Sequence, residues 1–304
     1  MLESARVTNV QASTFECGGI AIACCLRHIY TDLNGVANFL KAWAAATFGD
    51  RSAVRAPNVT APTLFPASPG ETWIHDAVYA MRAPFAFAEE FARKRLFFNP
   101  DSVKKLQDEA VIDGEADRKP TRFESVSACL WRSFISASLI NKRGDDSKPT
   151  VLFFPVNVRR READLPLDEQ SMGNIVLYNC AKQPDPELTT DSLSLSLLAQ
   201  KIREGVRKVD SGVIARLRFE GSGALKLILD ELSEELGGCG DMLLISSWCN
   251  FGLSDVNFGR GKPVWVVRVF CQFNVLASFL IKTTTPFGFF SILPFSLFTL
   301  ANLT

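Results

Sequence analysis

The chain has 304 residues, 47% of them hydrophobic and 22% charged, which is the composition of a globular protein with one large domain or two ordinary ones. Lys and Arg together number 33, as do Asp and Glu, so the formal net charge at pH 7 is zero. No overall field attracts a nucleic-acid backbone, and we expect no nucleic-acid partner.

The first residues and the cysteines indicate the compartment. The start, Met-Leu-Glu-Ser-Ala-Arg, has an acid at position 3 and no apolar segment, unlike a secretory signal. The eight cysteines contain no CxxC pair, and most lie in apolar runs, which favours buried free thiols in a reducing compartment. We therefore expect a cytoplasmic protein. The glycosylation sequon Asn58-Val-Thr60 has little weight without a secretory route.

The first elements expected in chain order are a strand and a helix. Residues 15–26 form a nearly continuous apolar run that contains Gly18-Gly19, which predicts a buried strand with a close backbone approach. His28 follows just beyond its end. Apolar residues then recur at helical spacing through 36–43, so a helix should begin soon after Asp32.

The next segments alternate between helices and strands. Four prolines in 56–70 predict a linker, and we place a domain boundary there. The further elements expected are strands at 95–98, 151–158, 242–247 and 264–269, and helices at 99–111, 121–134, 197–209 and 225–236. Alternation of this kind is typical of an α/β protein.

The tail, residues 269–304, differs in composition from the preceding chain. Lys282 is its one charged residue, and Phe, Leu, Ser, Ile and Thr dominate. Residues 287–303 are apolar and nearly long enough to span a bilayer, but Gly288 and Pro294 weaken the interpretation as a membrane anchor. The alternative that we favour is a translated non-coding segment, such as a retained intron.

His28-Ile-Tyr-Thr-Asp32 is an HxxxD motif placed where the first strand is expected to end. At a strand end an imidazole can face a cleft while the carboxylate fixes the neighbouring loop. Both residues also have a structural interpretation, because isolated histidines are often structural and Asp32 could simply cap the following helix.

The segments around this motif resemble the BAHD family of acyl-CoA-dependent acyltransferases, most closely the vinorine synthase-like branch. Residues 15–22, His28, Asp32 and the helix end at 39–44 resemble the family's catalytic strand, loop and helix. Other blocks follow in the family's order, at 95–106, 120–131, 154–159, 171–175 and 247–263.

The resemblance implies a two-domain α/β fold of the chloramphenicol acetyltransferase type, with mixed sheets and flanking helices. We assign 1–70 to a remnant of the first domain, 71–268 to the second domain and 269–304 to an aberrant hydrophobic tail. The family has most of a first domain before its histidine motif, whereas 27 residues precede His28, so the first domain is expected to be incomplete.

The resemblance also implies roles for the motif residues. His28 would be the general base that takes the proton from an alcohol or amine as it attacks the thioester of acyl-CoA. Acyl-CoA would be a co-substrate, with no permanently bound cofactor and no metal. Asp32 would not touch substrate but would pair with Arg159 and hold the loop, although the choice among the arginines of 159–161 is ambiguous.

The family's DFGWGKP signature reads Asn257-Phe-Gly-Arg-Gly-Lys-Pro263 in this chain. Asn257, Gly259 and Gly261 would shape a turn far from the base, and Arg260 would be destabilising if it were buried. Contacts on the CoA side are implied for Ser171, Gly173, Asn174, Ser247 and Trp248.

The implied function is acyl transfer to a hydroxyl or amine of a plant specialised metabolite by a monomer. Three alternatives stay open: an inactive fragment or pseudoenzyme of the same family, a protein anchored to a membrane through its tail, and a serine or cysteine hydrolase. The hydrolase is the weakest, because the sequence has no GxSxG nucleophile elbow.

Overall fold

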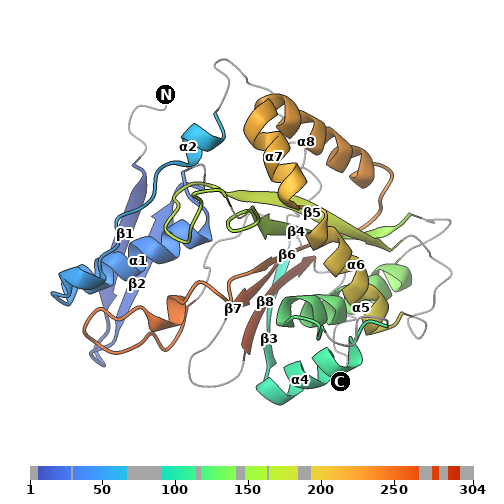
Figure 1. The fold of residues 1–304 in the computed structure, drawn as a ribbon. Coiled ribbons are helices and arrows are strands. Elements are labelled where there is room, and N and C mark those ends of the chain that lie inside the picture. The colour runs from blue at the N-terminus through green and yellow to red at the C-terminus, as the bar shows by residue number, and fades with distance from the viewer. Residues whose placement is uncertain are drawn as a thin grey trace.

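The computed structural model describes residues 6–28, 30–66, 91–113, 118–141, 148–162, 164–183, 193–266, 276–280 and 287–294. Figure 1 shows a two-stranded sheet with helix α1 on one side of the molecule and a larger sheet with helices around it on the other. The strand order in the larger sheet is β3-β8-β7-β6-β4-β5, with parallel and antiparallel neighbours. This is the mixed α/β architecture expected from the sequence.

A hairpin forms the small sheet and replaces the single buried strand predicted for 15–26. Strand β1 (Thr8–Thr14) pairs antiparallel with β2 (Ile20–Leu26), and 15–19 make the turn between them. Gly18 has a φ of 80°, a left-handed conformation that glycine adopts at little cost, so the Gly-Gly pair makes a turn and not a strand interior. The prediction of a buried strand was also wrong, since Ile20 is 43% exposed.

Helix α1 (Leu33–Thr47) begins directly after Asp32, as predicted, and is followed by the short helices η1 (Arg51–Ala53) and α2 (Ala61–Leu64). Asn58 attaches this connecting segment to the larger sheet's loops, because its Nδ2 donates to the carbonyl of Pro166 at 2.9 Å. The side chain of the sequon is therefore engaged within the protein. The boundary placed near residue 70 lies outside the described residues.

The larger sheet has six described strands, which come from separate parts of the chain. They are β3 (Phe91–Phe98), β4 (Thr150–Asn157), β5 (Val176–Gln183), β6 (Met242–Ser247), β7 (Leu276–Leu280) and β8 (Phe287–Pro294). The predicted strands at 95–98, 151–158 and 242–247 are confirmed. Residues 264–266 are not in a strand, and the remainder of the strand predicted at 264–269 lies outside the described residues.

Two described segments of the tail form strands β7 and β8 of the larger sheet. Strand β7 pairs parallel with β6, and β8 pairs antiparallel with both β7 and β3. Pairing on both sides satisfies the backbone hydrogen-bonding groups of these two segments. The described segments of the tail, 276–280 and 287–294, thus belong to the larger sheet.

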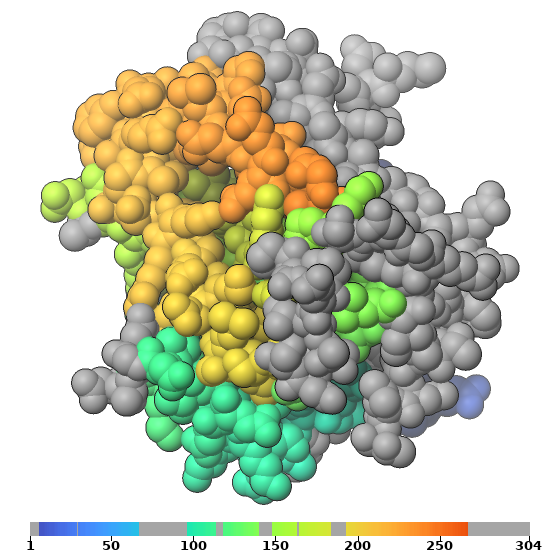
Figure 2. Space-filling model, turned by 90° about the vertical axis from the view of Figure 1, so that its right-hand side faces the viewer, coloured from blue at the N-terminus to red at the C-terminus, as the bar shows by residue number. Residues whose placement is uncertain are grey.

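Five longer helices surround the larger sheet: α4 (Pro100–Glu109), α5 (Arg122–Asn141), α6 (Leu195–Arg207), α7 (Ser211–Glu220) and α8 (Ser222–Leu236). Figure 2 shows α4 and α5 below, α6 in the middle and α7 and α8 above on one side of the molecule. The sequence pattern predicted all of them except α7. It also missed β5, whose Tyr178-Asn-Cys-Ala-Lys182 lacks β-branched residues.

Strand β4 is buried on both faces, which explains its unbroken apolar run. Leu152 and Phe154 point into the main core with α5 and α6, whereas Val151 and Phe153 point to the opposite face and pack with Leu232 of α8. Successive side chains of a strand alternate between faces, so one strand anchors helices on both sides. Because β4 is packed on both faces, the turn that follows it starts from a fixed position.

The described cysteines are all free thiols, but their burial differs from the prediction. Cys180 is buried, and burial raises the pKa of its thiol to about 12. Cys17 and Cys25 are exposed on the hairpin, because the apolar run that contains them is not covered as a core strand would be.

A buried ion pair that sequence reasoning missed joins α5 to α6. Glu124 and Thr121 form a capping box at the start of α5, in which Thr121 N donates to Glu124 Oε2 at 2.7 Å and Glu124 N donates to Thr121 Oγ1 at 3.2 Å. The same carboxylate accepts from Arg203 Nε and Nη2, both at 3.0 Å. Both side chains are almost fully buried. A single carboxylate therefore starts one helix and binds the next.

Replacing Glu124 with Gln should reduce the loss of the free energy of unfolding that occurs as the pH falls. Burial acts to raise the pKa of Glu124, but hydrogen bonds from Arg203 and Thr121 outweigh it, so the pKa is lowered. A carboxylate with a lowered folded pKa adds stability above its unfolded pKa of about 4.3, and this stability is lost as the pH falls. Urea unfolding between pH 7 and pH 3 should show a smaller loss for Glu124→Gln than for the parent chain.

The control for this experiment is Asp108→Asn. Asp108 forms an exposed ion pair with Lys119 at 3.4 Å, so its removal should leave the pH dependence nearly unchanged. If the free energies of unfolding of the parent chain and of Glu124→Gln fell equally with pH, Glu124 would not be the carboxylate that stabilises the fold.

Candidate functional site

Asp32 is held at the start of α1 by four hydrogen bonds to its carboxylate. Oδ1 accepts from Gly35 N and from Arg159 Nη2, both at 3.2 Å, and Oδ2 accepts from Arg159 Nη1 at 2.6 Å and from Ile175 N at 3.0 Å. The side chains of Asp32 and Arg159 are 5% and 1% exposed. Asp32 is thus both the helix cap and the partner of Arg159, so the two interpretations of this residue hold together.

The structure distinguishes the three arginines that follow β4. Arg159 binds Asp32, Arg160 is exposed and lies 3.2 Å from Glu169 Oε1, and Arg161 donates to the carbonyl of Val209 near the end of α6 at 2.7 Å. Arg160 has a φ of 61°, which is unusual for a residue other than glycine. The ambiguity within 159–161 is therefore resolved in favour of Arg159.

Two of the residues assigned to the CoA side lie in the loop beside this ion pair. The carbonyl of Ser171 accepts from Arg159 Nε at 3.2 Å and Nη2 at 2.8 Å, and the carbonyl of Gly173 accepts from Asp32 N at 3.1 Å. Ser171 is fully buried, and its hydroxyl binds Asp168 at 3.2 Å. Ser171 and Gly173 thus support Asp32 and Arg159, while Asn174 beside them is exposed.

Two asparagines of α1 bind the same loop, and sequence reasoning missed both. Nδ2 of Asn34 donates to the carbonyl of Glu169 at 2.7 Å, and Nδ2 of Asn38 donates to the same oxygen. Asn34 is 4% exposed. Their spacing of four residues places them on one face of the helix. Polar residues on an otherwise apolar face were the sequence pattern that could have indicated these hydrogen bonds.

His28 is exposed in a turn directly after β2, four residues before Asp32. Tyr30 N closes this turn on the carbonyl of Arg27 at 3.0 Å. The carboxylate of Asp32 faces Arg159, Gly35 and Ile175, so it anchors the chain that follows His28. The structure therefore has an exposed imidazole four residues before a carboxylate that is fixed by hydrogen bonds.

The signature loop is organised by Asn257. Its Oδ1 accepts from Gly259 N at 2.9 Å and from Gly261 N at 3.0 Å, and both glycines have positive φ values, 84° and 90°. An amide oxygen thus accepts both bonds at the sequence position where DFGWGKP has an aspartate. Arg260 is exposed, so the destabilisation expected for a buried cation does not arise.

Replacing Asn257 with Ala should lower the free energy of unfolding by about 1 to 2 kcal/mol, because two backbone donors lose their acceptor. Asn257→Asp keeps the oxygen and adds a charge, so it should be at least as stable as the parent chain. Thermal and urea unfolding would measure both, with the exposed Asn174→Ala as control. Equal stability of the two Asn257 variants would contradict this role for the oxygen.

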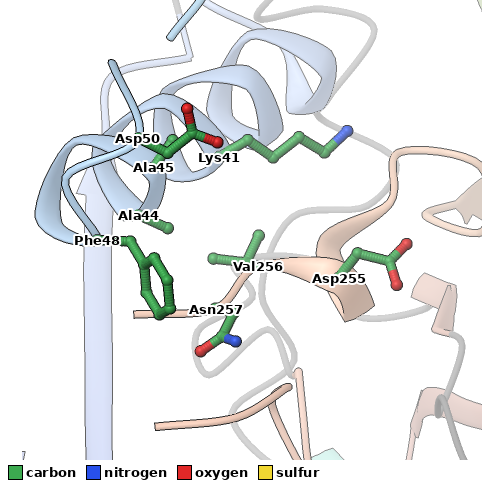
Figure 3. Close-up of a pocket in the computed structure, with 8 residues that line it drawn as sticks. All are labelled: Lys41, Ala44, Ala45, Phe48, Asp50, Asp255, Val256 and Asn257. Atoms are coloured by element: carbon green, nitrogen blue, oxygen red, sulfur yellow. The ribbon is translucent and has the colours of Figure 1, made fainter. Parts of the chain in front are cut away.

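A pocket of about 260 Å³ lies between the second half of α1 and the signature loop (Figure 3). Its lining residues are Lys41, Ala44, Ala45, Phe48, Asp50, Asp255, Val256 and Asn257. Lys41 is nine residues beyond Asp32, or roughly 14 Å along the helix. His28 is not among the lining residues, and the signature loop packs against α1 through Phe258 and Trp43, whose ring centroids are 4.7 Å apart. The signature is therefore part of the support of α1.

Ser247 and Trp248, also assigned to the CoA side, lie where β6 ends. Strand β6 runs parallel to β4, so the carboxyl ends of both strands lie at one edge of the sheet. Arg159 follows β4 at that edge and Trp248 follows β6. Edges of this kind commonly carry ligand sites in α/β proteins. The parallel pair thus brings the two separate sequence blocks to the same edge.

Within the described ranges, no group of three or more His, Cys, Asp or Glu side chains is arranged to hold a metal ion. Among the described helices, none combines the length and apolar character needed to cross a bilayer.

Comparison with known proteins gives a family and a fold. The model of the Transferase family matches residues 2–282. A limonoid 7-O-acetyltransferase of Citrus sinensis is 32% identical over 290 residues, covering 93% of this chain and 61% of the relative. Akuammiline synthase 1 of Alstonia scholaris is 33% identical over 271 residues, covering 86% of this chain and 58% of the relative. The chain thus spans about three fifths of the length of these relatives.

Solved structures of other proteins share the fold, and two of them show how far. Vinorine synthase superposes with a TM-score of 0.74 at 22% identity, covering 97% of this chain and 64% of that one. TRI101 of F. graminearum, in complex with coenzyme A and deoxynivalenol, has a TM-score of 0.70 at 19% identity, covering 96% of this chain and 67% of that one. The chloramphenicol acetyltransferase-like α/β fold expected from the sequence is confirmed.

Proposed function

Because the chain belongs to the Transferase family, the family of the BAHD acyltransferases, we propose that it transfers an acyl group from an acyl-CoA thioester to a hydroxyl or amine of a plant specialised metabolite. The observation that supports this most is the exposed His28 four residues before a carboxylate that is fixed by a buried ion pair. One of the relatives named above is a limonoid 7-O-acetyltransferase, so an alcohol acceptor and acetyl-CoA are the first pair to test.

In the proposed reaction His28 is the general base. Its neutral imidazole accepts the proton of the acceptor hydroxyl while the oxygen attacks the thioester carbonyl carbon. The tetrahedral intermediate collapses, the carbon–sulfur bond breaks, and the CoA thiolate takes the proton from the imidazolium. The products are the ester and free CoA, and the imidazole returns to its neutral form.

Asp32 and Arg159 act in this proposal through geometry. Their ion pair fixes the start of α1 against the loop that contains Ser171 and Gly173, and thereby limits where His28 can lie. Limiting the positions of a base relative to the bound substrates raises the rate, because less order remains to be gained at the transition state.

We propose that CoA binds at the edge of the sheet where strands β4 and β6 end. Asn174 and Trp248 are the candidate contacts there, together with Ser247, whose hydroxyl accepts from Cys249 N at 3.4 Å. Ser171 and Gly173 would act behind them as support. The cytoplasmic, monomeric enzyme expected from the sequence remains part of the proposal.

The test is to incubate the chain with acetyl-CoA and a panel of alcohols and amines, and to measure free CoA thiol together with acylated product by mass spectrometry. We expect equal amounts of thiol and ester with an alcohol acceptor, and no thiol without one. Thiol release in the absence of an acceptor would instead indicate hydrolysis. Absence of product with every acceptor would overturn the proposal for this chain.

A second candidate is a non-catalytic CoA-binding protein of the same family. The observation that favours it is the signature loop, in which Asn257 and Arg260 stand where DFGWGKP has Asp and Trp. Calorimetric titration with CoA separates the candidates, because binding without turnover supports the second and binding with turnover the first.

A further inference from the structure

Asn157, the last residue of β4, contacts the arginine that binds Asp32. Its side-chain Oδ1 accepts from the main-chain N of Arg159 at 3.0 Å and from Nη1 of the same residue at 3.3 Å. Nη1 is also the atom that lies 2.6 Å from Asp32 Oδ2. One amide oxygen therefore touches both ends of the arginine, its backbone and its guanidinium.

The backbone of Asn157 holds the next arginine as well. Its carbonyl accepts from Nε of Arg161 at 2.9 Å, and Nη1 of Arg161 donates to the carbonyls of Val206 and Val209 at 3.0 and 2.7 Å. The left-handed backbone of Arg160 separates the two arginines. The turn after β4 is thus tied to the end of α6 on one side and to Asp32 on the other, with Asn157 at its root.

A long arginine side chain loses considerable rotamer freedom when it is fixed. The guanidinium has five N–H donors in a rigid plane, so holding one edge of that plane sets the direction of the others. In this structure the edge held by Asn157 Oδ1 contains Nη1, and the plane then faces Asp32 and the carbonyl of Ser171.

We propose that Asn157 is a positioning residue for acyl transfer, whose side-chain oxygen aims Arg159 at Asp32 and so sets the loop that carries His28. This inference rests on the proposed function. It assigns Asn157 no contact with either substrate.

The first test compares Asn157→Ala with Asn157→Asp in the full chain. The alanine variant should lower kcat about tenfold or more and leave KM for acetyl-CoA within about twofold, because geometry at the base changes while the donor contacts do not. The aspartate variant retains an oxygen at the same position and should recover most of that rate. Failure of a folded aspartate variant to recover activity would overturn the proposal.

Asn179→Ala is the matched control. Asn179 lies on the neighbouring strand β5 and also binds backbone through its Oδ1, which accepts from Cys180 N at 2.7 Å. The Asn179→Ala variant should lose stability, as Asn157→Ala does, because each removes a side-chain hydrogen bond to the backbone of a strand or its end. Its kcat should stay unchanged. An equal fall in kcat for Asn157→Ala and Asn179→Ala would show a general effect on the sheet and overturn the positioning role.

The second test does not need turnover. Urea unfolding of the parent chain, Asn157→Ala, Asp32→Asn and the double variant forms a double-mutant cycle. Asn157→Ala should lower the folding equilibrium constant by a factor that is roughly twofold or more smaller in the Asp32→Asn background than in the parent chain. Additive effects would overturn the inference even if acyl transfer is found. If the parent chain transfers no acyl group but the cycle shows coupling, the proposed function fails while the contact between Asn157 and the ion pair stands.

Discussion

His28→Ala should lower the rate of acyl transfer by about 10² to 10⁴ while leaving the stability of the fold nearly unchanged. A general base contributes a rate factor of this size, because without it the attacking hydroxyl must lose its proton to water. His28 is exposed in the turn after β2, so removal of its ring opens no cavity. The measurements, made on the parent chain and on His28→Ala, are kcat with acetyl-CoA and an alcohol acceptor, and thermal unfolding.

Two further variants make this result specific to His28. His28→Gln retains a polar side chain of similar reach that cannot act as a base near neutral pH, and it should be as inactive as the alanine variant. His75→Ala changes the other histidine of the chain, which lies outside the described residues, and should keep most of the rate. Full turnover by His28→Ala would remove the histidine from the mechanism.

Asp32→Ala and Arg159→Ala should each lower the free energy of unfolding by about 3 to 5 kcal/mol, since each leaves a buried charge without its partner. The ion pair is nearly inaccessible to solvent, and Arg159 Nη1 lies 2.6 Å from Asp32 Oδ2. The double variant removes both charges together, so its loss should be clearly smaller than the sum of the single losses. Urea unfolding of the four chains measures this cycle.

The matched control is the exposed pair Lys208 and Glu235, with Nζ and Oε1 2.8 Å apart. Water screens these charges, so Lys208→Ala should change the free energy of unfolding by about 1 kcal/mol or less. Equal losses at the exposed and buried pairs, or additive losses at Asp32 and Arg159, would dismiss the buried ion pair as the element that fixes α1.

The sequence by itself determined the family, the α/β class and most strands and helices of the larger sheet and its surroundings. The apolar run of β4, the capping signal of Asp32 and the start of α4 at Asn99 each depend on residues within a few positions of one another. Local spacing and capping chemistry are sufficient to predict such elements. The HxxxD spacing and the ordered blocks around it likewise lie in the linear sequence.

The tertiary structure alone decided which distant residues meet. It selected Arg159 from three adjacent arginines to bind Asp32, which is 127 positions away, and joined Glu124 to Arg203 across 79 positions. It also divided 15–26 between a hairpin turn and strand β2, because a glycine with a left-handed backbone reverses the chain there. These outcomes depend on which strands pair and which faces become buried, and many distant partners with the same charges and apolar side chains would satisfy a local pattern equally well.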